Sequence, residues 1–309
     1  MNRYAFIVNP ISGRGAGQKN LPDLERLLKQ NDIQHTTMLT QSPGHAIDLA
    51  KQAALDGYEG IIAVGGDGTA NEVLNGLMKA KEQSSNVYTM GIICVGRGND
   101  FAFGANIPAG IQAGVDTLVE NHQQMIDVGF VTGGDYPQGR YFGNGIGIGF
   151  DAVVGFEAVK LTWLSGFPSY IVAVLKTVFL YYRAPMVRIE YSGKSLELPT
   201  LMVSIMNGRR MGGGFMMAPK AKIDDGLLSI CVVNQVSRPR IFTLVPHFMK
   251  GTQETQTEIQ FLETDELKVT ALHGNLPAHA DGETLCVAGD QLQIKLLSKQ
   301  IKIICQPVG

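Results

Sequence analysis

A glycine-rich turn, Gly65-Gly66-Asp67-Gly68-Thr69, carries the residue types best suited to hold a phosphate. The apolar run 61–64 before it predicts a buried strand, and Asn71 falls in the first turn of a predicted helix. Glycine adopts positive φ and lacks a Cβ, so amides of such a turn and of the following helix can point at an anion. Asp67 adds a carboxylate for Mg²⁺ or a ribose, and Thr69 a hydroxyl that caps the helix or binds phosphate. We interpret this turn as a nucleotide site.

The turn also has a plainer interpretation, because Gly-Gly-Asp-Gly is a tight turn in many α/β proteins. Two better-known nucleotide motifs do not fit this chain. Gly13, Gly15 and Gly17 lack the spacing of the dinucleotide fingerprint, and the full P-loop pattern does not occur. The sequence therefore predicts a phosphate-binding loop of another design.

The elements that position this turn alternate between strand and helix over the first ~125 residues, which predicts a doubly wound, mainly parallel sheet. Ligands bind at the carboxyl ends of such strands. Asn9, Thr40, Gly65 and the loop 96–100 each follow a predicted strand, so we expect them at one edge of the sheet. The strands are predicted at 4–8, 36–39, 60–64 and 90–95, and the helices at 21–29, 45–55, 69–79 and 111–120.

After residue 127 the pattern changes to short β-like runs separated by Gly, Asn and Asp turns, which predicts a sandwich or barrel-like domain. We therefore expect two domains, an α/β domain at 1–127 and a β-rich domain at 128–309 whose C-terminal tail can pack back on the first. A helix is predicted at 240–249. The runs lie at 140–142, 186–191, 196–206, 227–233, 267–271, 278–280, 292–297 and 301–305.

Composition favours a cytoplasmic enzyme rather than a nucleic-acid-binding protein. The 309 residues are 45% hydrophobic and 17% charged, and the formal net charge of −2 gives no long-range attraction to nucleic acid or anionic lipid. The N-terminus has no apolar run of the kind that a signal peptide requires. The four cysteines lack the paired spacing of a metal or redox site, so we expect reduced, structural thiols.

The segment 157–182 is apolar and aromatic and has basic residues at its margins. It is too short and too interrupted to span a bilayer, which needs ~20 helical residues. We expect a helix that covers the β-rich core on one side and contacts a membrane surface peripherally with the other. Its aromatic residues are Trp163, Phe167, Tyr170, Phe179, Tyr181 and Tyr182.

Five clusters in this order resemble the diacylglycerol kinase catalytic family, and within it the soluble bacterial lipid kinases related to sphingosine kinases. The resemblance covers nearly the whole chain. It implies an α/β nucleotide-binding domain and a β-rich domain with the active site in the cleft between them. It also implies ATP, Mg²⁺ and transfer of the γ-phosphoryl group to a lipid hydroxyl, most fittingly that of diacylglycerol. The clusters are Asn9-Pro10 with Ser12-Gly13, residues 65–69 with Asn71-Glu72, Gly98-Asn99-Asp100-Phe101, residues 222–227, and Asp281-Gly282-Glu283.

The resemblance also implies roles for individual residues. Asp281 matches the proposed general base, with Glu283 beside it. Lys222 and Leu227 would give backbone carbonyls, and Asp225 a carboxylate, to a metal site in the β-rich domain. The carboxylate network near the catalytic metal would be Asp67, Asp100 and Asp127, and the nucleotide contacts would be Asn9, Thr40, Gly65, Gly66, Asp67, Gly68, Thr69 and Asn71.

Several alternatives remain open at this level. Arg97 stands where the family commonly has Thr or Ser, and its guanidinium would clamp a phosphate, stay solvated or crowd the site. Asp281-Gly282 is also the dipeptide of a hairpin turn. His279 is interpreted as a packed histidine rather than as the base. NAD kinase shares the Gly-Gly-Asp-Gly turn, and a catalytically weak nucleotide-binding regulator is the third reading. An exposed strand edge in the β-rich domain would also allow a homodimer.

Overall fold

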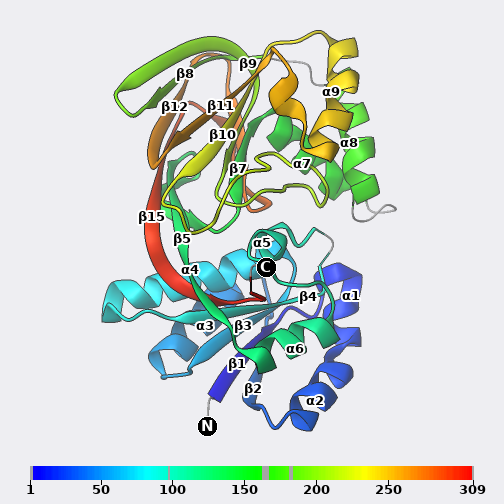
Figure 1. Cartoon of the computed structure of the whole chain (residues 1–309), viewed down its shortest axis with the longest axis vertical. Coiled ribbons are helices and arrows are strands. Elements are labelled where there is room, and N and C mark those ends of the chain that lie inside the picture. Colours follow the sequence, from blue (N-terminus) through cyan, green and yellow to red (C-terminus); the bar gives the residue numbers. More distant parts are fainter. Residues whose placement is uncertain (1–2, 97, 162–166, 181–183, 308–309) are drawn as a thin grey trace. The chain divides into compact units, whose positions relative to one another are not determined.

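The computed structural model describes residues 3–96, 98–161, 167–180 and 184–307 (Figure 1). The chain divides into two compact units. Unit 1 comprises residues 1–128 and 298–309, and unit 2 comprises residues 129–297. Each unit has its own buried core, and each is described separately below.

Unit 1 is built on a parallel sheet with the strand order β2-β1-β3-β4. The last part of β15 (Gln291–Ile304) adds a further parallel partner, because Lys302 and Ile303 pair with β4. The predicted parallel sheet is therefore confirmed. Its strands are β1 (Arg3–Val8), β2 (Gln34–Leu39), β3 (Gly60–Gly65) and β4 (Thr89–Cys94).

Helices cover both faces of this sheet, as a doubly wound arrangement requires. One face packs on α2 and α6, and Phe6 and Val64 are buried there. The other face contacts α3 and α4, which approach each other closely: a Cβ on Gly76 would lie 2.6 Å from the Cβ of Ala50. The helices are α1 (Ser12–Lys19), α2 (Leu21–Gln30), α3 (His45–Leu55), α4 (Asp67–Ser84), α5 (Asp100–Gly104) and α6 (Ile111–Glu120).

Unit 2 is a largely antiparallel, sandwich-like arrangement of strands, which confirms the predicted β-rich domain. Alternate residues of the strands, such as Val203 and Ile205, fill its core. The strands are β5 (Gln123–Gly133, which begins in unit 1), β6 (Tyr136–Phe142), β7 (Gly145–Gly149), β8 (Met186–Tyr191), β9 (Lys194–Met206), β10 (Leu228–Asn234), β11 (Ile259–Thr264), β12 (Glu266–His273), β13 (Leu276–Ala280) and β14 (Glu283–Gly289).

Three helices of unit 2 lie against the outer face of β7, β9 and β10 (Figure 1). They are α7 (Phe150–Lys160), α8 (Phe167–Leu180) and α9 (Arg238–Lys250), and a 3₁₀ turn follows at Gln253–Thr255. The residues of β9 that alternate with its inner residues, among them Met202 and Met206, pack under these helices. In the described part of the chain, no helix combines the length and apolar character needed to cross a membrane.

Some predicted elements were wrong. The strands predicted at 292–297 and 301–305 form one continuous strand, β15. Lys299 has φ of +50° there, and its amide donates a 2.7 Å hydrogen bond to Asp127 Oδ1. Strands β5, β7, β11 and β14, helices α1 and α5 and most of α7 were not predicted. Glycine at every second position of β7 hides its strand character, because glycine is a poor strand former.

The four cysteines are free and buried, as predicted for structural thiols. Burial raises the pKa of the Cys231, Cys286 and Cys305 thiols, which keeps them protonated and unreactive. These residues therefore contribute packing rather than chemistry.

Candidate functional site

The loops after the four parallel strands of unit 1 gather at one edge of the sheet, as predicted. Asn9, after β1, donates its side-chain amide to Thr69 Oγ1 at 3.1 Å, which joins that loop to the turn after β3. Thr40, after β2, donates its backbone amide to the Val8 carbonyl oxygen at 2.9 Å. The loop after β4 joins the same group, because the amide of Gly96 donates to the carbonyl oxygen of Gly65.

Two glycines allow these loops to touch through their backbones. A Cβ on Gly96 would lie 2.3 Å from the Cα of Gly66, which no real side chain tolerates. A Cβ on Gly65 would lie 2.5 Å from the Cβ of Thr69. Only glycine therefore permits this close packing of the loops.

Helix α4 begins one residue after Gly66, which occupies the N-cap position. The suggestion that Thr69 caps this helix is therefore wrong, because Thr69 lies in its first turn and accepts the hydrogen bond from Asn9. Helix α4 therefore starts at the gathered loops, and the N-terminus of a helix favours an anion. Asn71 is fully buried and accepts a 3.1 Å hydrogen bond from the side chain of Asn75.

Asp67 and Asp100 come together around Gly98. A Cβ on this glycine would lie 2.7 Å from Asp67 Oδ2 and 3.3 Å from Asp100 Oδ2. Asp67 is held in place because its Oδ1 accepts a 3.1 Å hydrogen bond from the Phe101 amide. Two carboxylate oxygens in a space that a side chain would otherwise fill are suitable donors for Mg²⁺.

The remaining predicted carboxylate, Asp127, is fully buried in β5. Its Oδ1 accepts the amide of Lys299, so it ties β5 to β15. Arg97 lies outside the described residues, as do Trp163, Tyr181 and Tyr182 of the aromatic segment.

Glu72 does not face the turn that precedes it in sequence. Its carboxylate accepts hydrogen bonds from the backbone amides of Gly44 at 2.8 Å and Ala46 at 3.1 Å. These amides belong to the N-terminal end of α3, whose N-cap residue Gly44 has no side chain to satisfy them. Glu72 therefore caps a neighbouring helix from a distance.

The predicted metal ligands of unit 2 lie in the loop between β9 and β10. Lys222 and Asp225 are exposed, and Asp225 Oδ1 accepts a 3.0 Å hydrogen bond from the amide of Leu227. A carboxylate and two backbone carbonyls are oxygen donors of the kind that a hard cation prefers. Groups of three or more His, Cys, Asp or Glu side chains placed to hold a metal do not occur among the described residues.

Asp281 follows the β13 strand and forms a two-residue hairpin turn with Gly282, since Ala280 pairs with Glu283. The hairpin interpretation is therefore confirmed. The expectation that its side chain is free was wrong. The carboxylate is buried and accepts backbone amides from Gly143 at 2.7 Å, Asn144 at 3.0 Å and Gly145 at 2.9 Å.

This network fixes Asp281 in position and orientation. Its φ of +48° is a left-handed conformation that is uncommon outside glycine, and three amide donors stabilise it. Glu283, two residues later, is partly exposed at the start of β14. None of the described residues hydrogen-bonds or pairs with the Glu283 carboxylate.

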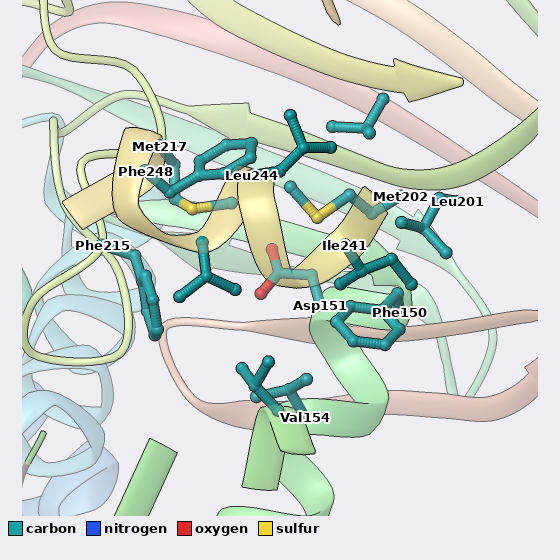
Figure 2. A pocket seen from close by; sticks show the side chains of 13 residues that line it. Phe150, Asp151, Val154, Leu201, Met202, Phe215, Met217, Ile241, Leu244 and Phe248 are labelled. Atoms are coloured by element: carbon teal, nitrogen blue, oxygen red, sulfur yellow. The ribbon is translucent and has the colours of Figure 1, made fainter. Parts of the chain in front are cut away.

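An apolar pocket lies within unit 2, between the helices and the outer face of the sheet (Figure 2). Its cavity volume is about 60 Å³, which is several times the space that one water molecule needs. The carboxyl group of Asp151, from α7, points into it between apolar side chains such as Phe150, Ile241 and Leu244 (Figure 2).

Asp151 was not identified from the sequence. Ser204 Oγ donates a 2.8 Å hydrogen bond to its Oδ2. Burial raises the pKa of Asp151, while the charge of His279 and the bond from Ser204 oppose that rise. The only sequence signal was an acidic residue inside the otherwise apolar run 150–154.

Helix α8 has one buried side and one exposed side. Ala173, Val174 and Val178 are buried, whereas Leu175 and Phe179, four residues apart, are 44% and 68% exposed. The prediction that this segment covers the β-rich core is confirmed. Contact of this exposed side with a membrane stays a prediction.

Comparison with known proteins gives two matched domains. The diacylglycerol kinase catalytic domain matches residues 3–131, and the YegS C-terminal NAD kinase beta sandwich-like domain matches residues 144–305. The diacylglycerol kinase of Bacillus subtilis (strain 168) is 29% identical over 285 residues, which cover 92% of this chain and 90% of that protein. The diacylglycerol kinase of Staphylococcus saprophyticus is 26% identical over 282 residues, which cover 91% of this chain and 88% of that protein.

Solved structures agree with this fold. A crystal structure of a diacylglycerol kinase from Bacillus anthracis superimposes with a TM-score of 0.74 at 23% identity, over 99% of this chain and 97% of that one. The NAD kinase of Archaeoglobus fulgidus in complex with ATP superimposes with a TM-score of 0.53 at 13% identity, over 98% of this chain and 93% of that one. At these identities both structures bear on the fold alone.

The capping role of Glu72 makes a first prediction. We expect Glu72→Ala to lower the free energy of unfolding by about 1 kcal/mol, because two amides of α3 lose their acceptor. Urea denaturation followed by circular dichroism measures this loss. The matched control is Lys79→Ala on the exposed side of α4, which should change stability far less. Equal stability of the two variants would contradict the capping role.

Proposed function

Because the chain belongs to the diacylglycerol kinase catalytic family, we propose that it transfers the γ-phosphoryl group of ATP to the hydroxyl of a lipid, most fittingly diacylglycerol. The lipid part of this proposal rests on the apolar pocket of unit 2. Its apolar lining favours a lipid over a polar acceptor such as NAD. The nucleotide part rests on the gathered loops of unit 1.

In this proposal ATP phosphates bind at the N-terminus of α4, because the amides of a first helical turn favour an anion. Asn9 and Thr69 hold two loops together, so the phosphate-binding backbone is set before the ligand arrives. Asp67 and Asp100 would hold Mg²⁺, which neutralises phosphate charge when it is bound. A second cation would sit at Asp225 with the carbonyls of Lys222 and Leu227 and would stabilise that loop.

Asp281 is the proposed proton acceptor for the lipid hydroxyl. The three amides that hold its carboxylate support this role, because a general base must stay in one orientation while the substrate binds. Glu283 is placed to assist, since it is close in the hairpin and its side chain is partly exposed.

Peripheral contact with a membrane would deliver the lipid. The exposed side chains of Leu175 and Phe179 on α8 support it, because apolar residues at a helix surface insert into the headgroup region of a bilayer. The same helix lines the pocket through Val174, so a lipid that leaves the bilayer at α8 would have a short path to it.

Incorporation of labelled γ-phosphate tests the proposed reaction. Purified protein is incubated with labelled ATP and, in separate reactions, with dioleoylglycerol, sphingosine or NAD. We expect label in the glyceride product. Label in NADP would favour the NAD kinase alternative, which has fold similarity in its support. Nucleotide binding without label in any product would favour the regulator alternative.

The charge of Asp67 makes a second prediction. We expect Asp67→Asn to weaken Mg-ATP binding at least about tenfold, because an amide keeps the hydrogen bond to Phe101 but removes a metal-binding charge. Titration calorimetry measures the affinity. Asp48→Asn, at an exposed position of α3, is the control and should bind as the wild type does. Unchanged affinity in Asp67→Asn would remove this residue from the site.

The Asp281 network makes a third prediction. We expect Asp281→Asn to lower turnover by about 10²–10⁴-fold with nearly unchanged ATP affinity, because the proton acceptor is lost. The variant should also melt at a lower temperature, since an amide NH₂ group would face a backbone N–H. Glu283→Gln should melt like the wild type and lose less activity. Wild-type turnover in a folded Asp281→Asn variant would exclude the role.

The surface of α8 makes a fourth prediction. We expect the double variant Leu175→Glu, Phe179→Glu to lose binding to phosphatidylglycerol vesicles, because both changes place charge where apolar groups would insert. Flotation in a density gradient measures the bound fraction. The control is Val119→Glu on α6 of unit 1, which is 52% exposed in the wild type. Equal flotation of all three proteins would argue against contact through α8.

A further inference from the structure

The loop that holds Asp281 is the short connection between β6 and β7. Residues 143–145 direct three successive backbone amides at one carboxylate, with Gly143 on Oδ2 and Asn144 and Gly145 on Oδ1. Successive amides that converge in this way form a concave anion site, whose shape depends on the backbone conformation. The position of the Asp281 carboxylate therefore depends on the contacts that fix this loop.

A second loop, which follows β9, binds the carbonyl groups of the first. The carbonyl oxygen of Asn144 accepts two backbone amides at 2.8 Å, from Asn207 and Gly208. The carbonyl oxygen of Gly143 accepts the side-chain amide of Asn207, also at 2.8 Å. The peptide groups around Gly143 and Asn144 thus donate to Asp281 and accept from the loop after β9.

The side chain of Asn144 makes a connection in the opposite direction. Its Nδ2 donates a 3.0 Å hydrogen bond to the carbonyl oxygen of Arg210, in the loop after β9. Asn144 and Asn207 are both buried, where hydrogen bonds are stronger than they are in water. Two asparagine side chains, one from each loop, therefore hold the two loops together beside Asp281.

Glycines allow the two loops to approach each other closely. A Cβ on Gly208 would lie 2.1 Å from Asn144 Oδ1. A Cβ on Gly145 would lie 2.7 Å from the sulfur of Met206, at the end of β9. A methyl group at position 208 would therefore displace the side chain of Asn144 without removing any hydrogen-bonding group.

We propose that Asn144 and Asn207 are positioning residues for phosphoryl transfer. They hold residues 143–145 so that the amides of this loop keep Asp281 in one orientation as the proton acceptor. This inference rests on the proposed kinase function. In this role both side chains act through Asp281 rather than on a substrate, because proton transfer requires a carboxylate at hydrogen-bond distance and in alignment with the hydroxyl.

Steady-state kinetics with ATP and dioleoylglycerol tests this role. We expect Asn144→Ala and Asn207→Ala to lower kcat by about tenfold to hundredfold, because Asp281 loses its fixed orientation. The KM values for ATP and for the glyceride should stay within about twofold of the wild type, since neither side chain binds a substrate.

The matched control is Thr264→Val, at the end of β11. Thr264 is a buried residue of unit 2 whose hydroxyl donates a 3.0 Å hydrogen bond to the carbonyl oxygen of Glu266. The control variant therefore loses a bond of the same kind at a position that does not contact the Asp281 loop. We expect it to keep the wild-type kcat.

A double-mutant cycle separates positioning from general destabilisation. Because Asn144 acts through Asp281, we expect Asn144→Ala to have no further effect on kcat in a protein that already carries Asp281→Asn. A side chain that only stabilises the fold would lower kcat by the same factor in both backgrounds. Equal losses in the two backgrounds would overturn the positioning role.

Amide hydrogen exchange gives a measurement that does not depend on activity. We expect the amides of residues 143–145 to exchange faster in Asn144→Ala and Asn207→Ala than in the wild type or in Thr264→Val, because the loop opens more often. Gly208→Ala should show the same faster exchange and lower kcat, since it displaces Asn144. It takes the place of Asn144→Ala if that variant does not fold.

The failure of this inference is distinct from the failure of the kinase function. A wild type that phosphorylates the glyceride, with unchanged kcat in the folded Asn144→Ala and Asn207→Ala variants, would overturn the positioning role alone. Exchange at residues 143–145 as slow as in the wild type would also overturn it. A wild type that transfers no phosphate to any lipid would reject the kinase function, and the positioning role with it.

Discussion

Hydrogen bonds from backbone amides to carboxylates hold the turns on which both units depend. A tight turn or a helix start leaves amides without backbone partners, and a buried amide without a partner is costly. Asp281 satisfies three such amides, Glu72 satisfies two at the start of α3, and Asp67 satisfies one at the start of α5. The acidic residues of the predicted motifs therefore shape the site as much as they offer charge to a ligand.

At other positions the arrangement depends on glycines, which lack a side chain. Gly96 and Gly66 let the loops after β3 and β4 touch, and Gly98 leaves the space that Asp67 and Asp100 share. Gly147 does the same in unit 2, where it leaves room for Asp151 and His279. In each case a Cβ would collide with an atom of a neighbouring residue. Substitution of these glycines would thus remove a site rather than loosen a turn.

Much of this arrangement could be predicted from residue types and spacing. The alternation of apolar runs and helical stripes predicted the parallel sheet, and helices α3 and α6 begin and end where expected. The Gly-rich turn was placed correctly at the sheet edge, because a strand followed by glycines and a helix has few other local structures. Strand β15 was divided wrongly, because its middle is polar and its extension depends on partners distant in sequence, such as Asp127.

Local sequence thus determined the strands and helices of unit 1, the turn that offers its amides to an anion, and the likeness to one kinase family. Tertiary structure alone decided what the polar side chains do. Glu72 caps a distant helix, Asp281 is held by amides from another strand connection, and Asp151 faces an apolar pocket. The physical reason is that a local pattern reports backbone preference and burial, whereas hydrogen bonds and pockets are made by segments that meet only when the chain has folded.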